Sequence, residues 1–189
     1  HSVWVNEEGI ETYAQKNVGV AHCPVSNMKL ASGAAPVMSM RAAGVEVGLA
    51  TDGPASNDDL DLWQEIKFAP LLARVTALDA ATMTPRDALT MATTEGARVI
   101  GNGDTGVLQI GAKADFIRLE LDTPTFVPVT NDDELIAHVA WSGSGRHVTD
   151  VWVQGTHVVA DRRLTNFDLE RAIAEVQTRG LRLAEDSAT

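Results

Sequence analysis

The sequence predicts an α/β fold in which a parallel sheet is followed by a smaller β-rich module, and three observations point to it. First, two short apolar segments, 17–23 and 45–52, read as buried strands. Second, each follows a short helical segment, 7–16 and 36–43, and such alternation is typical of parallel strands with helices outside the sheet. Third, the pattern changes after Gly103 to short segments typical of a β-rich module.

The first helix and the first strand carry clear boundary signals. Asn6 can cap the helix at 7–16, which begins with two glutamates placed favourably at its positive end. Residues 1–5 read as the last residues of a strand or as the loop just after one. The strand at 17–23 is stopped by Pro24.

A loop and a second helix lead to the second strand. Residues 26–33 read as a loop. Pro36 starts a helix that continues to Ala43 and is stopped by Gly44. The strand after it ends abruptly at Thr51-Asp52-Gly53-Pro54, where glycine and proline begin a new loop.

Two helices without a strand between them follow. Asp59 or Asp61 can cap a helix over 60–78, in which apolar residues recur at helical spacing. Thr84 caps a second helix over 86–100. The alternation of strands and helices therefore stops after the second strand.

Three segments of the β-rich module read as strands: 106–111, 114–121 and 148–159. The last contains a tight hairpin turn at Gln154-Gly155 or Gly155-Thr156. Between the strands, 135–140 reads as a helical turn or a strand. The chain then closes with an amphipathic helix over 168–184, whose apolar side comprises Leu169, Ile173, Val176 and Leu181.

The composition limits the possible partners. Of 189 residues, 44% are apolar, and 15 basic residues stand against 26 acidic ones for a net charge of -11. This balance argues against nucleic acid or an anionic membrane as a partner, because both require basic patches. A single cysteine, Cys23, and the lack of a long apolar run favour a cytoplasmic protein without an internal disulfide. The first residue is His1 and not Met, so we expect a processed product or a fragment.

Asp52 is the first candidate for chemistry. It lies at the carboxyl end of a strand that reads as buried in a parallel sheet, where ligands and catalytic groups collect in α/β folds. An ordinary turn is the alternative, because Asp before Gly-Pro is a common turn former.

Five segments resemble motifs of the amidohydrolase superfamily. The branch is that of the aminohydrolases that deaminate S-adenosylhomocysteine and methylthioadenosine, together with the related triazine chlorohydrolases. Residues 48–57 resemble the motif of the eighth strand, residues 22–33 that of the seventh, and residues 1–8 that of the sixth. Residues 88–98 resemble the helix after the barrel. The segment 111–116 also resembles the turn into the family's β-sandwich domain.

The resemblance implies an α/β fold that is the carboxyl-terminal part of a TIM (β/α)₈ barrel, followed by a small β-sandwich module and a terminal helix. Residues 1–102 would be the partial barrel with strands six to eight, and residues 103–189 the composite sandwich with its closing helix. The paired histidines after the family's first strand, the histidine on its fifth strand and a nearby glutamate have no counterpart in this sequence. The amino-terminal half of the barrel is therefore an implied partner.

The same resemblance implies three site residues. Asp52 matches the aspartate that binds the metal and accepts the proton of the attacking water, and His1 matches the histidine that steadies the tetrahedral intermediate. Ser56 matches a position that can touch the ribose or tail of the substrate, which His1 also contacts. The resemblance also implies one divalent metal as the cofactor, zinc with iron as the alternative. A catalytic zinc usually has three protein ligands and one water, whose pKa it lowers to about 7.

Other candidates have simpler interpretations. His22, at a strand end, reads as structural or pocket-lining, and Cys23 as a buried small hydrophobic residue. Asn27 reads as a loop residue bonded to backbone. The cluster Asp58-Asp59-Asp61 is better explained by a solvated helix start than by a second metal site. The remaining candidates read as packing or surface residues: His138, His147, His157, Trp63, Trp141 and Trp152.

The expected function is hydrolytic deamination of an adenine-containing nucleoside such as S-adenosylhomocysteine or methylthioadenosine, with release of ammonia. The alternatives within the branch are a guanine or oxoguanine deaminase and a triazine chlorohydrolase. A different alternative is a catalytically inert half-barrel that needs its amino-terminal half. The full-length enzyme is expected to be a homo-oligomer.

Overall fold

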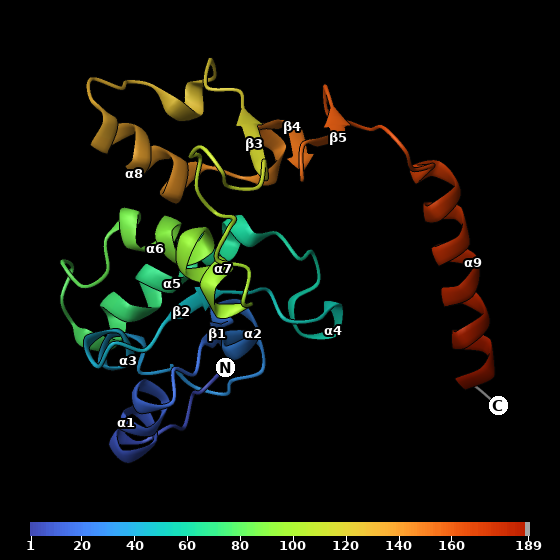
Figure 1. Cartoon of the computed structure of the whole chain (residues 1–189). Coiled ribbons are helices and arrows are strands. Elements are labelled where there is room, and N and C mark those ends of the chain that lie inside the picture. Colours follow the sequence, from blue (N-terminus) through green and yellow to red (C-terminus); the bar gives the residue numbers. More distant parts are fainter. Residues whose placement is uncertain (188–189) are drawn as a thin grey trace.

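The computed structural model describes residues 1–187, which contain two sheets; helices surround the first sheet, and the second lies at the edge of the molecule (Figure 1). Within these residues the first sheet has two strands, β1 (Val20–His22) and β2 (Val47–Leu49), which run parallel with His22 opposite Leu49. The predicted parallel pairing is confirmed. Residues 1–6 hold a turn and no strand, which agrees with the loop alternative for residues 1–5. Of the strands six to eight that the resemblance implies, the described residues therefore contain two.

Helices surround this short sheet and close its core. They are α1 (Glu7–Gln15), α2 (Pro24–Lys29), α3 (Val37–Ala42), α4 (Pro54–Asn57), α5 (Leu62–Ala77), α6 (Pro85–Ala92) and α7 (Thr94–Val99). Asn6 and Asp61 cap α1 and α5 as predicted, and Thr84 forms a capping box with Asp87 at α6. The core lies between the sheet and the helices and includes Val20, Met40, Val47, Ile66 and Met91.

Three predicted elements differ from the structure in this part. The loop expected to begin at Gly53-Pro54 holds the short helix α4, because proline is tolerated in the first turn of a helix. The segment 26–33, expected to be a loop, begins within α2. Pro24 occupies the first turn of that helix, a position that tolerates a missing N–H, so it ends the strand and also starts a helix. The helix expected over 86–100 is broken at Thr93, whose backbone (φ -119°, ψ -94°) is not helical.

The break at Thr93 brings α7 against β2. A Cβ added to Gly48 would lie 2.7 Å from the Cα of Gly96, so the strand and the helix touch through two residues without side chains. This contact depends on residues far apart in the sequence, which explains why helical spacing alone did not predict the break.

The second sheet is antiparallel, with the order β3 (Phe116–Leu119), β4 (Val148–Val153), β5 (Thr156–Ala160) and β6 (Arg163–Leu164). Its hairpin turn lies at Gln154-Gly155, where both residues have positive φ. The described residues form one layer here, where the sequence predicted a sandwich. The expected strand at 106–111 is also absent, because Gly106 and Gly111 adopt positive φ and the segment has no pairing strand.

Helix α8 (Asp132–Ser142) connects the two halves of the molecule. Of the two alternatives predicted for 135–140, a helical turn or a strand, the structure has the helical one, extended to 11 residues, and this helix packs on α5 and α6. The indole N–H of Trp63 donates to the carbonyl oxygen of Val139 at 2.9 Å. This helix belongs to the predicted second domain, residues 103–189, and packs on helices of the first, residues 1–102. The domain boundary at residue 102 therefore stays a prediction.

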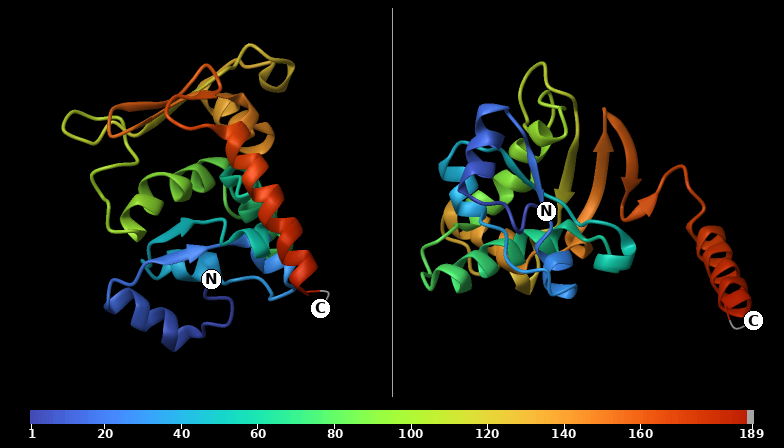
Figure 2. Two further views of the ribbon diagram at one scale, coloured as in Figure 1. Left: turned by 90° about the vertical axis from the view of Figure 1, so that its right-hand side faces the viewer. Right: turned by 90° about the horizontal axis from the view of Figure 1, so that it is seen from below.

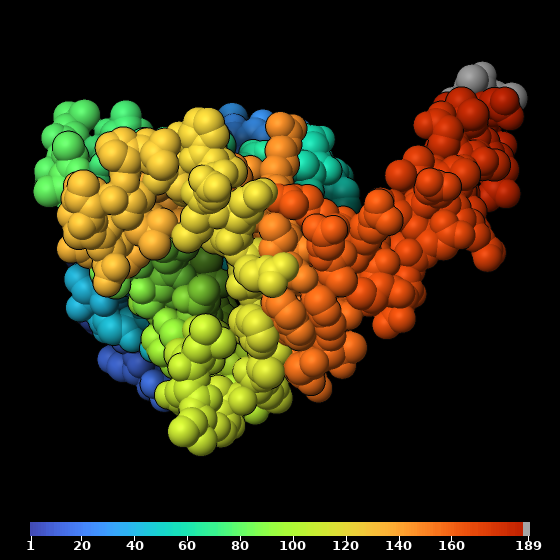
Figure 3. Space-filling view, turned by 90° about the horizontal axis from the view of Figure 1, so that it is seen from above, coloured from blue at the N-terminus to red at the C-terminus, as the bar shows by residue number. Residues whose placement is uncertain are grey.

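Helix α9 (Leu169–Ser187) stands apart from the rest of the described chain (Figures 1, 2 and 3). The predicted amphipathic helix is present, but it does not close onto the body. Ile173 and Val176 on its apolar side are 61% and 71% exposed. The described residues therefore leave this side uncovered.

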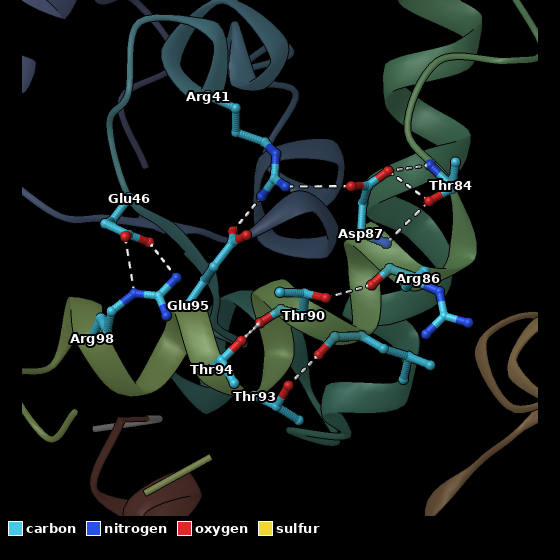
Figure 4. A network of polar contacts seen from close by, with 11 residues as sticks. Arg41, Glu46, Thr84, Arg86, Asp87, Thr90, Thr93, Thr94, Glu95 and Arg98 are labelled. Atoms are coloured by element: carbon cyan, nitrogen blue, oxygen red, sulfur yellow. Dashed lines mark hydrogen bonds and ion pairs between the residues drawn. The ribbon is translucent and has the colours of Figure 1, made fainter. Parts of the chain in front are cut away.

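A polar network ties α3 to α6 and α7 on the side shown in Figure 4. The guanidinium of Arg41 contacts the carboxylates of Glu95 and Asp87. Arg98 pairs with Glu46, the residue that precedes β2. Arg41 thus bridges the two helices that Thr93 separates.

Among the described helices, none is both long and apolar enough to cross a membrane.

Candidate active site

The parallel pairing places the ends of β1 and β2 at one edge of the sheet. The backbone N–H of Ala50 donates to the carbonyl oxygen of His22 at 2.9 Å, so the pairing continues just past both strands. Asp52 follows two residues later with a φ of 65°, in the left-handed region that few residues other than glycine adopt. Such strained backbone is concentrated at functional sites.

Two serine hydroxyls hold the Asp52 carboxylate. Ser26 from α2 and Ser56 from α4 both donate to Oδ2, at 2.8 Å and 2.7 Å. The hydroxyl of Ser56, that of Ser26 and the backbone N–H of Gly53 lower the pKa of Asp52 from its ordinary value. Among the described residues, no side chain contributes a hydrogen bond to Oδ1. Asp52 is therefore ionised at neutral pH, and the described side chains leave its Oδ1 without a donor.

His1 faces the same carboxylate oxygen. Its Nε2 lies 3.4 Å from Oδ2 of Asp52, and its Nδ1 lies 2.7 Å from Oδ1 of Asn27. If this amide oxygen accepts, Nδ1 carries the proton and a neutral ring has its lone pair on Nε2. When protonated, the ring can donate from Nε2 to Asp52.

Asn27 differs from its sequence interpretation. It lies in α2, is 1% exposed, and its side-chain oxygen bonds to the ring of His1 and not to backbone. Its Nδ2 has no hydrogen-bond partner among the described residues. The structure thus brings together His1, Asp52 and Ser56, the three residues singled out in the sequence, and adds Ser26 and Asn27. Their position directly after a strand end was the signal that could have identified them.

The remaining candidates keep structural roles. His22 is 1% exposed and lines a cavity of about 230 Å³ between α3 and α5, and its pKa is lowered to about 4, mainly by burial and also by the N-terminal ammonium group. Burial raises the pKa of Cys23 to about 11, which leaves its thiol unreactive at neutral pH. Among residues 58–61, Asp61 caps α5 and Asp58 pairs with Lys29.

The other histidines and tryptophans pack or pair away from the site. His157 contacts Asp150 at 2.9 Å and stacks on Trp152, and His138 bonds to the carbonyl oxygen of Pro128. The ring of His147 lies edge-on to that of Phe126. Two tryptophans also have structural contacts, as the Trp63 indole bonds to backbone and the Trp141 ring lies under a guanidinium.

The donor set near Asp52 fits a divalent metal in part. The open Oδ1 of an ionised carboxylate suits a zinc ion, and an imidazole lies on the same side. No cluster of three or more His, Cys, Asp or Glu side chains able to hold a metal occurs among residues 1–187. Since a catalytic zinc takes three protein ligands, the described residues supply a fraction of such a site.

Comparison with known proteins gives a consistent picture. The sequence model of the amidohydrolase family matches residues 1–158. The chain is 42% identical over 187 residues to the 5-methylthioadenosine/S-adenosylhomocysteine deaminase of Dictyoglomus thermophilum, covering 99% of this chain and 43% of that protein. It is 40% identical over 177 residues to the 5'-deoxyadenosine deaminase of Methanosarcina mazei, covering 94% and 40%. The chain therefore spans about two-fifths of the length of these curated relatives.

Solved structures agree with the sequence comparison. An adenosine deaminase from Xanthomonas campestris with bound zinc superposes with a TM-score of 0.91 at 33% identity, over 98% of this chain and 42% of that one. Atrazine chlorohydrolase from Arthrobacter aurescens complexed with zinc gives a TM-score of 0.86 at 30% identity, over 94% and 39%. The α/β fold of this chain is thus that of a part of these zinc-containing hydrolases.

Proposed function

The chain belongs to the amidohydrolase family, and from this premise we propose that it forms part of an enzyme that hydrolytically deaminates an adenine nucleoside. S-adenosylhomocysteine and methylthioadenosine are the proposed substrates, because relatives at 40–43% identity carry the names of deaminases for these compounds. The observation that carries the proposal is the convergence of His1, Asp52 and Ser56 at one edge of the sheet.

Each side chain has a role in the proposed reaction. Asp52 is ionised and can take the proton that the attacking water loses, while the water oxygen adds to the amine-bearing carbon of the adenine ring. Nε2 of His1 lies on the side of Asp52 and can steady the tetrahedral intermediate. Asp52 then returns this proton to the amine nitrogen, and the collapse of the intermediate releases ammonia. The hydroxyl of Ser56 donates a hydrogen bond to Asp52, so the lone pairs of its oxygen can accept from a ribose hydroxyl.

A divalent metal is the proposed cofactor, zinc with iron as the alternative. When bound, zinc supplies hydroxide from water at neutral pH. Oδ1 of Asp52 is the atom of this chain proposed to bind it. The other ligands are proposed to come from the part of the relatives that this chain does not span, because the described residues contain no three-residue metal cluster.

A chimeric enzyme tests the proposal. The segment of the Dictyoglomus thermophilum deaminase that aligns with this chain is replaced by these 189 residues. Ammonia release is measured with S-adenosylhomocysteine, methylthioadenosine, 5'-deoxyadenosine and guanine, and chloride release is measured with atrazine. We expect zinc binding and release of ammonia from the adenine nucleosides, and a loss of at least about 100-fold for Asp52→Asn.

The same experiment separates the alternatives. Turnover of guanine or atrazine in place of the adenine nucleosides would assign another reaction of this branch. Stoichiometric zinc and deamination by the 189-residue chain alone would show that no further ligands are needed and would contradict the proposed division of the site.

A further inference from the structure

Glu65 is a buried carboxylate that joins two segments of the site without touching Asp52. It lies on α5 and is 0% exposed. Oε2 accepts the backbone N–H of Val25 at 3.1 Å, in the first turn of α2. Oε1 accepts the side-chain N–H of Asn57 at 2.6 Å, at the end of α4. The two oxygens thus hold two different helices.

The residues that Glu65 holds are sequence neighbours of the two serines. Val25 precedes Ser26 and Asn57 follows Ser56. Both serine hydroxyls donate to the same atom, Oδ2 of Asp52, and they can do so only while α2 and α4 keep their spacing. The side-chain oxygen of Asn57 also accepts the backbone N–H of residue 60, which fixes the orientation of its amide.

We infer that Glu65 is a positioning residue, which sets the spacing between α2 and α4 and thereby holds both serine hydroxyls on one oxygen of Asp52. The inference rests on the proposed function only in treating Asp52 as a reacting group. The hydrogen bonds themselves are independent of metal and substrate.

The chemistry of the two partners requires a carboxylate at this position. Val25 and Asn57 each present an N–H, so both atoms facing them must be acceptors. Glutamine at position 65 offers one acceptor and one donor and can satisfy only one of them. Burial raises the pKa of Glu65 to about 7, with the nearby Asp59 adding to the rise, so the carboxylate is mostly ionised at pH 8.

A second link crosses the same gap on the surface. Nζ of Lys29 donates to the carbonyl oxygen of Ala55 at 3.2 Å and to Asp58 at 2.7 Å. Exposed ion pairs of this kind contribute little, because water competes for both partners. Lys29 therefore provides a control that joins the same two helices from the exposed side.

Two spectroscopic measurements on the full 189-residue chain at pH 8 test the inference. The ¹³Cγ chemical shift of Asp52 reports the hydrogen bonds that its carboxylate accepts, with Ser26→Ala and Ser56→Ala as references. Amide exchange of Val25 reports the contact with α2. For Glu65→Gln we expect the ¹³Cγ chemical shift of Asp52 to move in the direction seen in Ser26→Ala and Ser56→Ala. We also expect the amide hydrogen of Val25 to exchange about tenfold faster.

Two further variants separate positioning from stability. Asn57→Ala releases α4 alone, so the Asp52 signal should move toward that of Ser56→Ala while Val25 keeps its protection. Glu95→Gln removes a largely buried carboxylate on α7 and should lower stability without moving the Asp52 signal. Lys29→Met should also leave that signal in place.

The inference is overturned if Glu65→Gln leaves the Asp52 signal at its wild-type position, or if Lys29→Met moves it as far as Glu65→Gln does. If Glu65→Gln does not fold, Asn57→Ala is the test, and an unchanged Asp52 signal in that variant overturns the inference. None of these readouts requires zinc or deamination. A failure of the proposed function therefore leaves the result intact.

Discussion

Glu65 and His22 are both buried, and their effects on stability should oppose each other as the pH changes. Burial raises the pKa of Glu65 from 4.5 to about 7, so the folded protein holds a proton that the unfolded chain has lost. The stabilisation that this pKa shift of Glu65 adds to the unfolding free energy is fully present below pH 4.5 and is lost as the pH rises to 7. Burial lowers the pKa of His22 from 6.5 to about 4, so its contribution is present above pH 6.5 and is lost as the pH falls to 4.

The magnitudes follow from the two shifts. Each pH unit between the unfolded and folded pKa changes the unfolding free energy by about 1.4 kcal/mol, so each group accounts for about 3 kcal/mol at most. Between pH 4.5 and 6.5 the two slopes have opposite sign and cancel. Glu65→Gln removes the falling slope, and its unfolding free energy relative to wild type should rise by about 3 kcal/mol from pH 4.5 to 7.

Urea unfolding at half-unit steps from pH 4.5 to 7.5 measures this difference, because other carboxylates contribute equally to both proteins. His22→Gln should show the opposite trend, with a relative stability that falls from pH 4.5 to 6.5. The double variant is the matched control and should follow the wild-type pH profile between pH 4.5 and 6.5, displaced by a constant. A difference between Glu65→Gln and wild type that stays constant to within about 0.5 kcal/mol would refute the raised pKa of Glu65.

Three substitutions should lower the unfolding free energy for reasons visible in the fold, each measured by urea unfolding at pH 7. Arg41→Ala leaves the carboxylate of Glu95, 13% exposed, without its cation and should cost about 3 kcal/mol; a cost below about 1 kcal/mol would contradict a buried pair. Gly48→Ala puts a methyl group against the backbone of Gly96 and should cost about 1–3 kcal/mol, whereas an unchanged stability would mean that α7 can move aside. Thr84→Ala removes the capping box and should cost about 1 kcal/mol, with Thr84→Ser as the control that retains it.

The elements around Asp52 were predictable because their signals are local. A buried apolar run that is stopped by Gly-Pro is a strand, and the alternation with helices makes the strand parallel. The short helix α4 that begins at Pro54 was not predicted. Asn6, Asp61 and Thr84 each cap the helix that follows them, since a side-chain oxygen needs only the next three residues to do so.

The features that the sequence did not predict depend on distant partners. The hydrogen bond between His1 and Asn27 joins residues 26 positions apart, and it forms only because α2 begins directly at the strand end. The break at Thr93 depends on the close contact of Gly96 with β2. Glu65 lies in an ordinary helical pattern. It accepts hydrogen bonds from two other helices, but its sequence neighbours are like those of a glutamate that faces solvent.

The expected strand at 106–111 shows the limit of apolar patterning. Leu108 and Ile110 alternate as in a strand, yet they are 81% and 106% exposed. Alternation predicts a strand only when a neighbouring strand completes its hydrogen bonds, and the positive φ of Gly106 and Gly111 turns the chain away from one. Glycine at both ends was the signal for two turns.

The unequal oxygens of Asp52 have a consequence for cation selectivity. Because Oδ2 accepts from two serines, a cation can reach this carboxylate through one oxygen only, unless a serine hydrogen bond breaks. Calcium is commonly held by carboxylates that present both oxygens, at six to eight ligands in total. Monodentate attachment suits the low coordination number of zinc instead. The serines would thus discriminate between metals without touching one.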